Sequence, residues 1–139
     1  MIPKALVVED SADFRTLICL ILERLGFDGL ADESAEGALD RLDGGYLPAV
    51  IITDFDLGVG MDGGDFLREV RRRPTLSAVP VILTSNHPSI QQMAVELAFD
   101  GFVEKKSILS NLPQLLRALV LCHASFPGWG GELAPKTRR

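Results

Sequence analysis

Two apolar or β-branched runs of the sequence lead directly into acidic residues. Residues 49–53 (Ala-Val-Ile-Ile-Thr) precede Asp54, and residues 5–8 (Ala-Leu-Val-Val) precede Glu9 and Asp10. Uninterrupted runs of this kind are typical of strands that are buried on both faces of a parallel sheet. The carboxyl ends of such strands border the crevice in which open α/β sheets keep their functional sites. Because a carboxylate placed there costs desolvation free energy unless a cation meets it, we expect Asp54 to be functional.

The acidic residues are numerous enough to predict a metal ion. Asp56 lies two residues beyond Asp54, so these two acids gather with Glu9 and Asp10 at one edge of the predicted sheet. Carboxylates that lie close together repel one another and hold raised pKa values unless a hard cation joins them. Mg²⁺ prefers carboxylate oxygens, keeps several waters and takes phosphate oxygens as further ligands. The pattern therefore favours Mg²⁺ as a cofactor.

A hydroxyl and an ammonium group follow two further apolar runs. Thr84 comes after Val79–Leu83, and Lys105 comes shortly after Gly101–Val103. Opposite a metal ion, these two groups would complete a cradle for the equatorial oxygens of a phosphoryl group. The carboxylate of Asp54 would then be an in-line nucleophile that forms an acyl phosphate.

Each of these residues also has an ordinary structural explanation. Asp10 fits a helix cap or a turn, Thr84 fits the end of a strand, and Lys105 fits a surface lysine. What favours a functional site is the combination, because acids, hydroxyl and lysine all fall at the carboxyl ends of different strands.

Strand-like and helix-like segments alternate five times along the chain. The expected strands cover residues 5–8, 27–31, 49–53, 79–83 and 101–103, and the expected helices begin after Ser11, Ser34, the glycine-rich segment 58–64, Ser89 and Lys106. The inward positions of the fourth helix are Ile90, Met93, Ala94, Leu97 and Ala98. This alternation predicts the α/β class: a five-stranded parallel sheet with helices on both faces, a doubly wound (βα)5 fold.

The same stretches resemble the receiver domains of two-component response regulators. The resemblance covers roughly Lys4 to Ala124, and its matching stretches are Leu6–Ser11, Ile51–Asp54, Met61–Gly63, Val81–Ser85 and Gly101–Lys105. It implies a flavodoxin-like fold with strand order 2-1-3-4-5. It also implies a cytoplasmic signalling protein, a monomer or weak homodimer, that catalyses only its own phosphorylation and dephosphorylation.

The resemblance assigns a role to each site residue. Asp54 would accept the phosphoryl group from a histidine kinase or a histidine phosphotransfer protein. Glu9, Asp10 and Asp54 would hold Mg²⁺ together with the backbone carbonyl of Asp56. Thr84 and Lys105 would contact the phosphoryl group, and Phe102 would be the aromatic residue that changes rotamer on activation.

Two positions depart from the family pattern. Leu57-Gly58 stands where Met-Pro is usual, and the loop that follows is about one residue longer, as in receivers attached to hybrid kinases. Lys106 stands where a proline with a cis peptide bond is usual, which leaves the geometry of the Lys105–Lys106 bond open.

Three other interpretations compete. Asp54 and Asp56 resemble the D-x-D motif of haloacid-dehalogenase-type phosphatases, in which Asp54 would be the nucleophile and Asp56 the general acid. The segment Gly58–Gly63 matches G-x-G-x-x-G, but two acids separate it from the preceding strand, which disfavours dinucleotide binding. A receiver that only binds partners would not need the complete set of acid, hydroxyl and lysine.

Composition limits the function classes. The chain has 139 residues, 47% of them apolar and 24% charged, which suits one globular domain over residues 1–124 followed by a tail over 125–139 that contains Phe126 and Trp129. The net charge of -5 argues against nucleic acid as a direct partner, and we interpret Arg71–Arg73 as solvated surface. No apolar run suggests a membrane span or a secretory signal. Cys19 and Cys122 are expected to be buried thiols.

Overall fold

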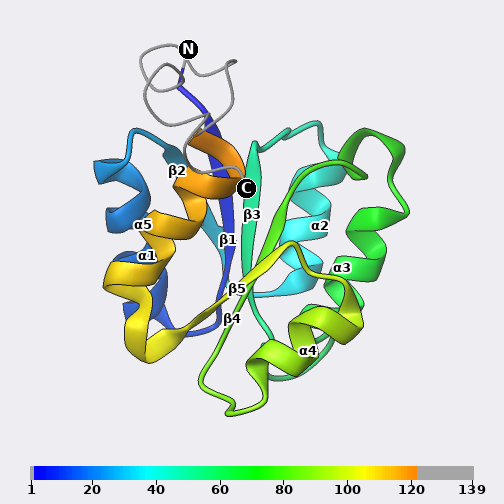
Figure 1. The fold of residues 1–139 in the computed structure, drawn as a ribbon. Coiled ribbons are helices and arrows are strands. Elements are labelled where there is room, and N and C mark those ends of the chain that lie inside the picture. Colours follow the sequence, from blue (N-terminus) through cyan, green and yellow to red (C-terminus); the bar gives the residue numbers. More distant parts are fainter. Residues whose placement is uncertain (1, 122–139) are drawn as a thin grey trace.

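The computed structural model describes residues 2–121 and contains one parallel sheet of five strands. The order is β2-β1-β3-β4-β5, and every neighbouring pair is parallel (Figure 1), which confirms the predicted fold class. The strands are β1 (Lys4–Val8), β2 (Asp28–Asp32), β3 (Val50–Asp54), β4 (Val81–Ser85) and β5 (Gly101–Glu104). The expected boundary between a domain and a tail at residue 124 lies outside the described residues, as do Phe126 and Trp129.

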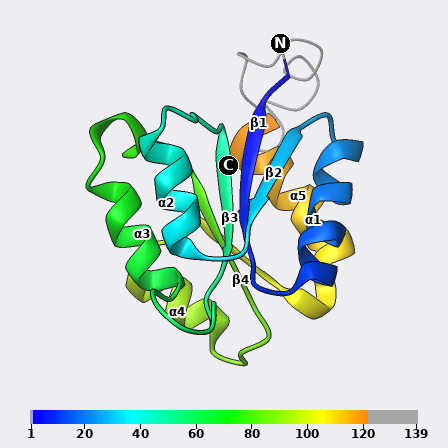
Figure 2. The same cartoon turned by 180° about the vertical axis from the view of Figure 1, so that it is seen from behind.

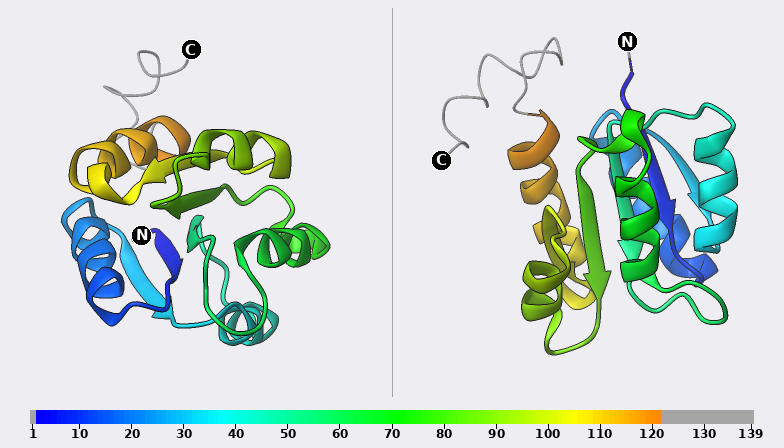
Figure 3. Two further views of the ribbon diagram at one scale, coloured as in Figure 1. Left: turned by 90° about the horizontal axis from the view of Figure 1, so that it is seen from below. Right: turned by 90° about the vertical axis from the view of Figure 1, so that its right-hand side faces the viewer.

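Helices cover both faces of the sheet. α1 (Ala12–Arg24) and α5 (Ile108–Leu116) lie on one face, whereas α2 (Ala35–Asp43), α3 (Gly63–Arg71) and α4 (Ile90–Leu97) lie on the other (Figures 1 and 2). Figure 3 shows the sheet between these two layers from two further directions. Short helical turns follow α3 (Pro74–Leu76), β5 (Lys105–Ser107) and α5 (Arg117–Leu121).

The apolar runs read from the sequence form the centre of the molecule. β3 and β4 are buried along their whole length, and β1 is buried from its second residue on. Their side chains alternate between two apolar clusters, one against α1 and α5 and the other against α2, α3 and α4. The two edge strands are less buried, as expected for strands with a neighbour on one side only.

Hydrogen-bonded caps fix where three of the helices begin. The side chains of Ser11 and Ser34 accept from the backbone N–H groups of Phe14 and Gly37, which confirms both as N-caps. At α3, Asp62 and Asp65 each accept from the other's backbone N–H, a reciprocal capping box. These caps set the loops that follow β1, β2 and β3.

Two burial predictions were wrong. Ala98, expected to face inward on the fourth helix, lies one residue beyond α4 in the left-handed conformation (φ 67°) and is exposed, because the helix ends at Leu97. Cys19 is half-buried rather than buried, because it faces the edge strand β2, where Gly29 has no side chain to cover the thiol. Cys122 lies outside the described residues.

The arginines at the end of α3 are only partly solvated. The guanidinium of Arg71 lies 2.6 Å from Asp100, and that of Arg73 lies 2.7 Å from Asp43. Arg72 is the most exposed of the three, although its guanidinium also lies 3.2 Å from Glu69. The interpretation of this run as solvated surface therefore holds best for Arg72, while Arg71 and Arg73 tie α3 to neighbouring segments.

The chain leaves β5 through a trans peptide at Lys105–Lys106. No peptide bond within residues 2–121 is cis, and Lys105, Lys106 and Ser107 form a single 3-10 turn that leads into α5. This geometry leaves Lys105 half-buried and Lys106 exposed.

Candidate functional site

The carboxyl ends of the central strands form one wall of a cavity. Strands β1, β3 and β4 end at neighbouring points of the same sheet edge because they are parallel and in register. The cavity at this edge has a volume of about 970 Å³. Its lining residues are Asp10, Asp54, Phe55, Asp56, Asp62, Ser85, Asn86, His87, Met93 and Lys105.

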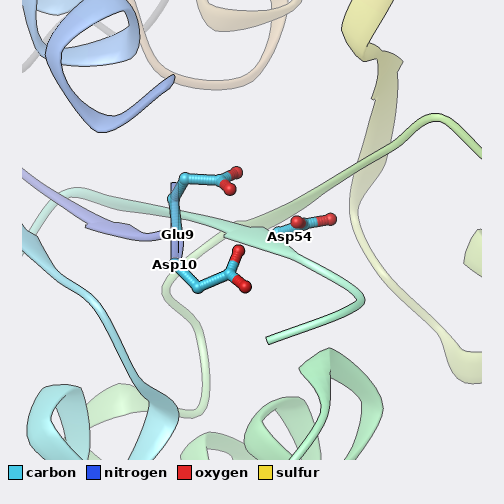
Figure 4. A group of neighbouring side chains, drawn as sticks. All are labelled: Glu9, Asp10 and Asp54. Atoms are coloured by element: carbon cyan, nitrogen blue, oxygen red, sulfur yellow. The ribbon is translucent and has the colours of Figure 1, made fainter. Parts of the chain in front are cut away.

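Three acids meet at this edge, as the sequence predicts. Glu9 and Asp10 leave the chain just after β1, and Asp54 ends the neighbouring strand β3 (Figure 4). One carboxylate oxygen from each of the three lies within 4.8 Å of the other two. Glu9 and Asp54 are buried and Asp10 is exposed, so the cluster extends from the end of the sheet to its surface.

Lys105 binds the two buried acids. Its Nζ donates to Oδ2 of Asp54 at 2.9 Å and to Oε2 of Glu9 at 3.2 Å. The same ammonium lies 4.6 Å from the centre of the Phe14 ring, a cation–π contact from the first turn of α1. Only 13% of the Lys105 side chain is exposed, so these groups fix the position of the ammonium.

Burial and neighbouring charges shift the pKa values of the three ionisable groups that meet at the site. Burial, followed by the charge of Asp54, raises the pKa of Glu9 to about 6. Burial also raises the pKa of Asp54, and it outweighs the hydrogen bond from Lys105. For Lys105, burial alone would lower the pKa, but Asp54 and Glu9 together outweigh it and raise the pKa, so the lysine stays charged.

The acid cluster fits a hard divalent cation. Its donors are all carboxylate oxygens, the ligand type that Mg²⁺ prefers, and their separation allows one ion to reach all three residues. Glu9 Oε1 is buried and accepts no hydrogen bond within the described part of the chain, although Lys105 Nζ lies 3.1 Å away. An oxygen in that state has capacity for a further positive partner.

Thr84 lies beside Asp54 in the sheet. The two residues are register partners of β3 and β4, so their side chains leave the sheet on the same face. The Thr84 hydroxyl is fully buried and has no hydrogen-bond partner among residues 2–121. It does not line the cavity, whereas the next two residues, Ser85 and Asn86, do.

Phe102 lies on the opposite face of the sheet from Thr84. It is half-buried against the apolar cluster that α2, α3 and α4 form, where its register partner is Leu83. The structure therefore does not bring Phe102 into the cavity with the other predicted site residues.

The loop after β3 has its own anchors. Asp56 is exposed at the cavity, and its Oδ1 accepts from the backbone N–H of Gly58. Leu57 is buried, and the N–H of Met61 donates to Glu36 on α2 at 2.9 Å. The position at which the family usually has proline is Gly58, with φ 80°, a conformation that favours glycine. The loop is thus anchored at both ends, by Asp56 near β3 and by Glu36 of α2.

Sequence reasoning missed several residues of the site. Phe14 packs against the apolar cluster that faces α1 and also contacts Lys105, and the backbone N–H of Ser11 donates to Glu9. Phe55, His87 and Met93 line the cavity. His87 is an exposed residue of the loop that follows β4. Position shortly after a strand end was a signal for Phe55 and His87, whereas Phe14 and Met93 reach the site through the packing of α1 and α4.

Comparisons with known proteins agree with this geometry. The chain matches the response regulator receiver domain family over residues 5–117. It is 36% identical over 115 residues to the chemotaxis protein CheY1 of Helicobacter pylori, which covers 82% of this chain and 90% of that protein. It is 25% identical over 125 residues to the phosphate regulon transcriptional regulatory protein PhoB of Escherichia coli, covering 86% of this chain and 54% of that protein. The chain thus spans about half the length of that relative.

A solved structure supports the same assignment. The signal receiver domain of a signal transduction histidine kinase from Syntrophus aciditrophicus superposes with a TM-score of 0.74 at 28% sequence identity, covering 84% of this chain and 89% of that chain. No helix within residues 2–121 is long and apolar enough to cross a membrane. Neither the family match nor these relatives favour the interpretation as a haloacid-dehalogenase-type phosphatase. With five strands in the order 2-1-3-4-5 and an acid cluster joined to a lysine at their carboxyl ends, the chain belongs to the receiver domain family of response regulators.

Proposed function

We propose that Asp54 is the phosphoacceptor of this receiver domain and that it takes a phosphoryl group from a histidine kinase or a histidine phosphotransfer protein. The observation that carries the proposal is the contact of 2.9 Å between Lys105 Nζ and Asp54 Oδ2 inside the acid cluster. Lys105 places a positive charge beside the carboxylate that is proposed to react, where it would also offset the charge of a phosphoryl group.

The transfer forms one bond to phosphorus and breaks another. A carboxylate oxygen of Asp54 attacks the phosphorus of a phosphohistidine, the P–N bond breaks, and the imidazole leaves with that electron pair. The product is an acyl phosphate on Asp54. Lys105 neutralises charge on the phosphoryl oxygens, and the unpaired hydroxyl of Thr84 has a hydrogen to donate to them.

Mg²⁺ is the proposed cofactor. Glu9, Asp10 and Asp54 would hold it through their carboxylates, and Asp56 through its backbone carbonyl. When bound, the ion supplies positive charge that offsets the acids and the incoming phosphoryl group. Because the acids repel one another without it, phosphorylation is expected to require the ion.

The consequence of phosphorylation would be a change in binding to another protein. Phe102 is the residue proposed to change rotamer, since it is half-buried and can move between two environments. We assign the receiver domain to residues 1–124 and a tail to 125–139, and we place the protein in the cytoplasm. In this role the chain modifies itself once per donor and is not an enzyme that turns over other substrates.

Incubation with acetyl phosphate and Mg²⁺, followed by intact mass spectrometry, tests the proposal. The wild type is expected to gain one phosphoryl group and Asp54→Asn none, while Asp40→Asn, which changes an exposed acid on α2, behaves as wild type. Continuous release of inorganic phosphate over many turnovers, without a stable protein adduct, would instead support the phosphatase in which Asp54 and Asp56 are nucleophile and general acid.

A further inference from the structure

Arg15 reaches back from α1 to the segment that carries two of the three acids. Its Nη1 donates to the backbone carbonyl of Glu9 at 2.9 Å and to that of Asp10 at 3.2 Å. The residue is half-buried, and both hydrogen bonds have a charged donor, which makes them stronger than bonds between neutral groups. Arg15 thus binds the chain at the point where it leaves β1 and has not yet entered α1.

These two carbonyls belong to the two peptide groups that flank the Cα atom of Asp10. Each peptide group is planar, so binding its oxygen fixes the orientation of the whole plane. When both planes on either side of a Cα atom are fixed, the direction of the Cα–Cβ bond is fixed as well. Arg15 therefore helps to set the direction in which the Asp10 side chain leaves the backbone.

The carboxylate of Asp10 needs this support more than its neighbour does. The Glu9 carboxylate accepts from the backbone N–H of Ser11 and from Lys105. The Asp10 carboxylate is exposed, and within residues 2–121 no hydrogen bond or ion pair holds it. Its place in the acid cluster is set through the backbone, where Glu9 accepts from the Ser11 N–H and Arg15 donates to the carbonyls on both sides of the Asp10 Cα atom.

We propose that Arg15 is a positioning residue for the metal site and that it presents the Asp10 carboxylate to the cation. The inference rests on the function proposed above, in which Glu9, Asp10 and Asp54 hold Mg²⁺. Arg15 itself is not a ligand, because a guanidinium has no lone pair to offer a cation.

The charge of Arg15 and its positioning role predict opposite changes in Mg²⁺ affinity when Arg15 is removed. The direction of the measured change therefore distinguishes the two. A positive charge near a cation site disfavours cation binding, so a residue that acted only through its charge would weaken Mg²⁺ binding. Removing it would then strengthen binding. If Arg15 acts by positioning Asp10, removing it weakens Mg²⁺ binding in spite of the lost repulsion.

Titration calorimetry with Mg²⁺ alone, on the full chain, separates the two effects. Arg15→Met keeps an apolar stem but removes both donors and the charge, and it is expected to weaken Mg²⁺ binding about tenfold, as changes to groups that support metal ligands do. Arg15→Lys keeps the charge and a donor and is expected to lose less. Arg24→Met removes a cation from the last turn of the same helix and serves as the matched control, with unchanged affinity.

A second readout distinguishes positioning from a general structural role. Phosphorylation of Arg15→Met by acetyl phosphate is expected to be slow at low Mg²⁺ and to approach the wild-type rate when Mg²⁺ is saturating, because the defect lies in binding the ion. If Arg15→Met does not fold, a loss of Mg²⁺ affinity in Arg15→Lys, whose shorter side chain reaches the carbonyls less well, carries the same test.

Several results would overturn the inference. One is Mg²⁺ binding in Arg15→Met, or in Arg15→Lys where only that variant folds, that is as tight as in the wild type or tighter. Another is a phosphorylation defect that saturating Mg²⁺ does not correct, which would indicate a structural role. In both cases the wild type still binds Mg²⁺ and is phosphorylated, so the proposed function stands. A wild type that does neither overturns the proposed function, and the inference about Arg15 with it.

Discussion

At the scale of single residues, the site depends on Lys105, whose ammonium contacts two carboxylates and an aromatic ring. Lys105 lies between two buried carboxylates and an aromatic ring, and it is largely excluded from solvent. A buried ammonium is stable only with such partners, and buried carboxylates likewise need a cation. Lys105, Asp54 and Glu9 therefore stabilise one another in the absence of a phosphoryl group.

The neighbouring lysine offers a matched comparison. Lys105→Ala is expected to slow phosphorylation by acetyl phosphate roughly 100-fold, as the loss of a group that stabilises developing charge does. Lys106→Ala is expected to have little effect, since Lys106 is exposed. Lys106→Pro should also be tolerated. Rates followed by intact mass decide the matter, and a defect in Lys106→Ala with a normal Lys105→Ala would show that the wrong lysine has been assigned.

Asp56 and Asn86 are expected to set the lifetime of the phosphorylated state. Both are exposed and line the cavity on the carboxyl side of their strands, where a water must approach the phosphorus. Asp56→Leu is expected to change the half-life of the adduct severalfold without preventing its formation, because the change alters access and polarity for that water. Decay is measured after removal of the donor, with Asp40→Leu as the control that decays like the wild type. An Asp56→Leu adduct that also decays like the wild type would contradict this role.

At the scale of elements, the junction between the β3–α3 loop and α3 packs closely against the backbone of Asp54. Gly63, the first residue of α3, lies against the backbone of β3: a Cβ atom there would be 2.5 Å from the Asp54 carbonyl oxygen and 2.9 Å from Phe55 Cα. A methyl group at the next residue, Gly64, would meet nothing closer than a side-chain oxygen of Asp62 at 3.3 Å. Only the first of these two glycines is required by a close approach of backbone atoms.

This difference predicts that one of two adjacent substitutions destabilises the fold and the other does not. Gly63→Ala is expected to lower the free energy of unfolding by about 1–3 kcal/mol, the usual range for overpacking, and to slow phosphorylation because it displaces Asp54. Gly64→Ala is expected to be nearly neutral, since alanine favours a helix more than glycine does. Urea denaturation of both variants tests the pair, and equal stabilities would contradict the close packing described for Gly63.

Features of the fold and the site that depend on local sequence could be predicted, whereas contacts between segments far apart in the sequence could not. The apolar runs before Glu9, Asp54 and Thr84 identify buried strands, because an uninterrupted apolar run is a local property of the sequence. Parallel pairing then brings the residues at the ends of these strands to one edge of the sheet. The prediction that Ala98 faces inward was wrong because α4 ends at Leu97. The end of a helix depends on the backbone conformation of one residue, which the periodicity of apolar side chains does not indicate. The contacts of Phe14 with Lys105 and of Arg15 with the Asp10 carbonyl arise only when α1 packs on the sheet.

At the scale of the whole molecule, the acid cluster lowers the stability of the fold, because Lys105 offsets the cost of its buried charges only in part. Apolar clusters on both faces of the sheet bury the helices and stabilise the fold, while Glu9 and Asp54 hold raised pKa values at one end of the same sheet. A raised carboxyl pKa means that the folded state disfavours the charged form relative to the unfolded chain. Binding of a cation should therefore stabilise the entire domain.

Thermal unfolding with and without Mg²⁺ tests this link. At a Mg²⁺ concentration of 100 times the dissociation constant, the wild type should gain about 2.7 kcal/mol, which appears as a higher melting temperature. Asp10→Asn should lose most of that gain, yet melt at a higher temperature than the wild type when no Mg²⁺ is present, because one repelling charge is gone. An equal response of both proteins to Mg²⁺ would mean that Asp10 is only a turn residue.

The central claim is that the phosphoryl group is carried by Asp54 and by no other residue. The most direct measurement is to phosphorylate the wild type with acetyl phosphate and Mg²⁺, reduce the acyl phosphate with borohydride, and map the modified residue by peptide mass spectrometry. Reduction converts an aspartyl phosphate into homoserine, which marks the site permanently. We expect homoserine at position 54 alone and none in a sample without donor. Homoserine at position 10 or 56 instead, or an unmodified position 54 in a protein that has gained phosphate, would contradict it.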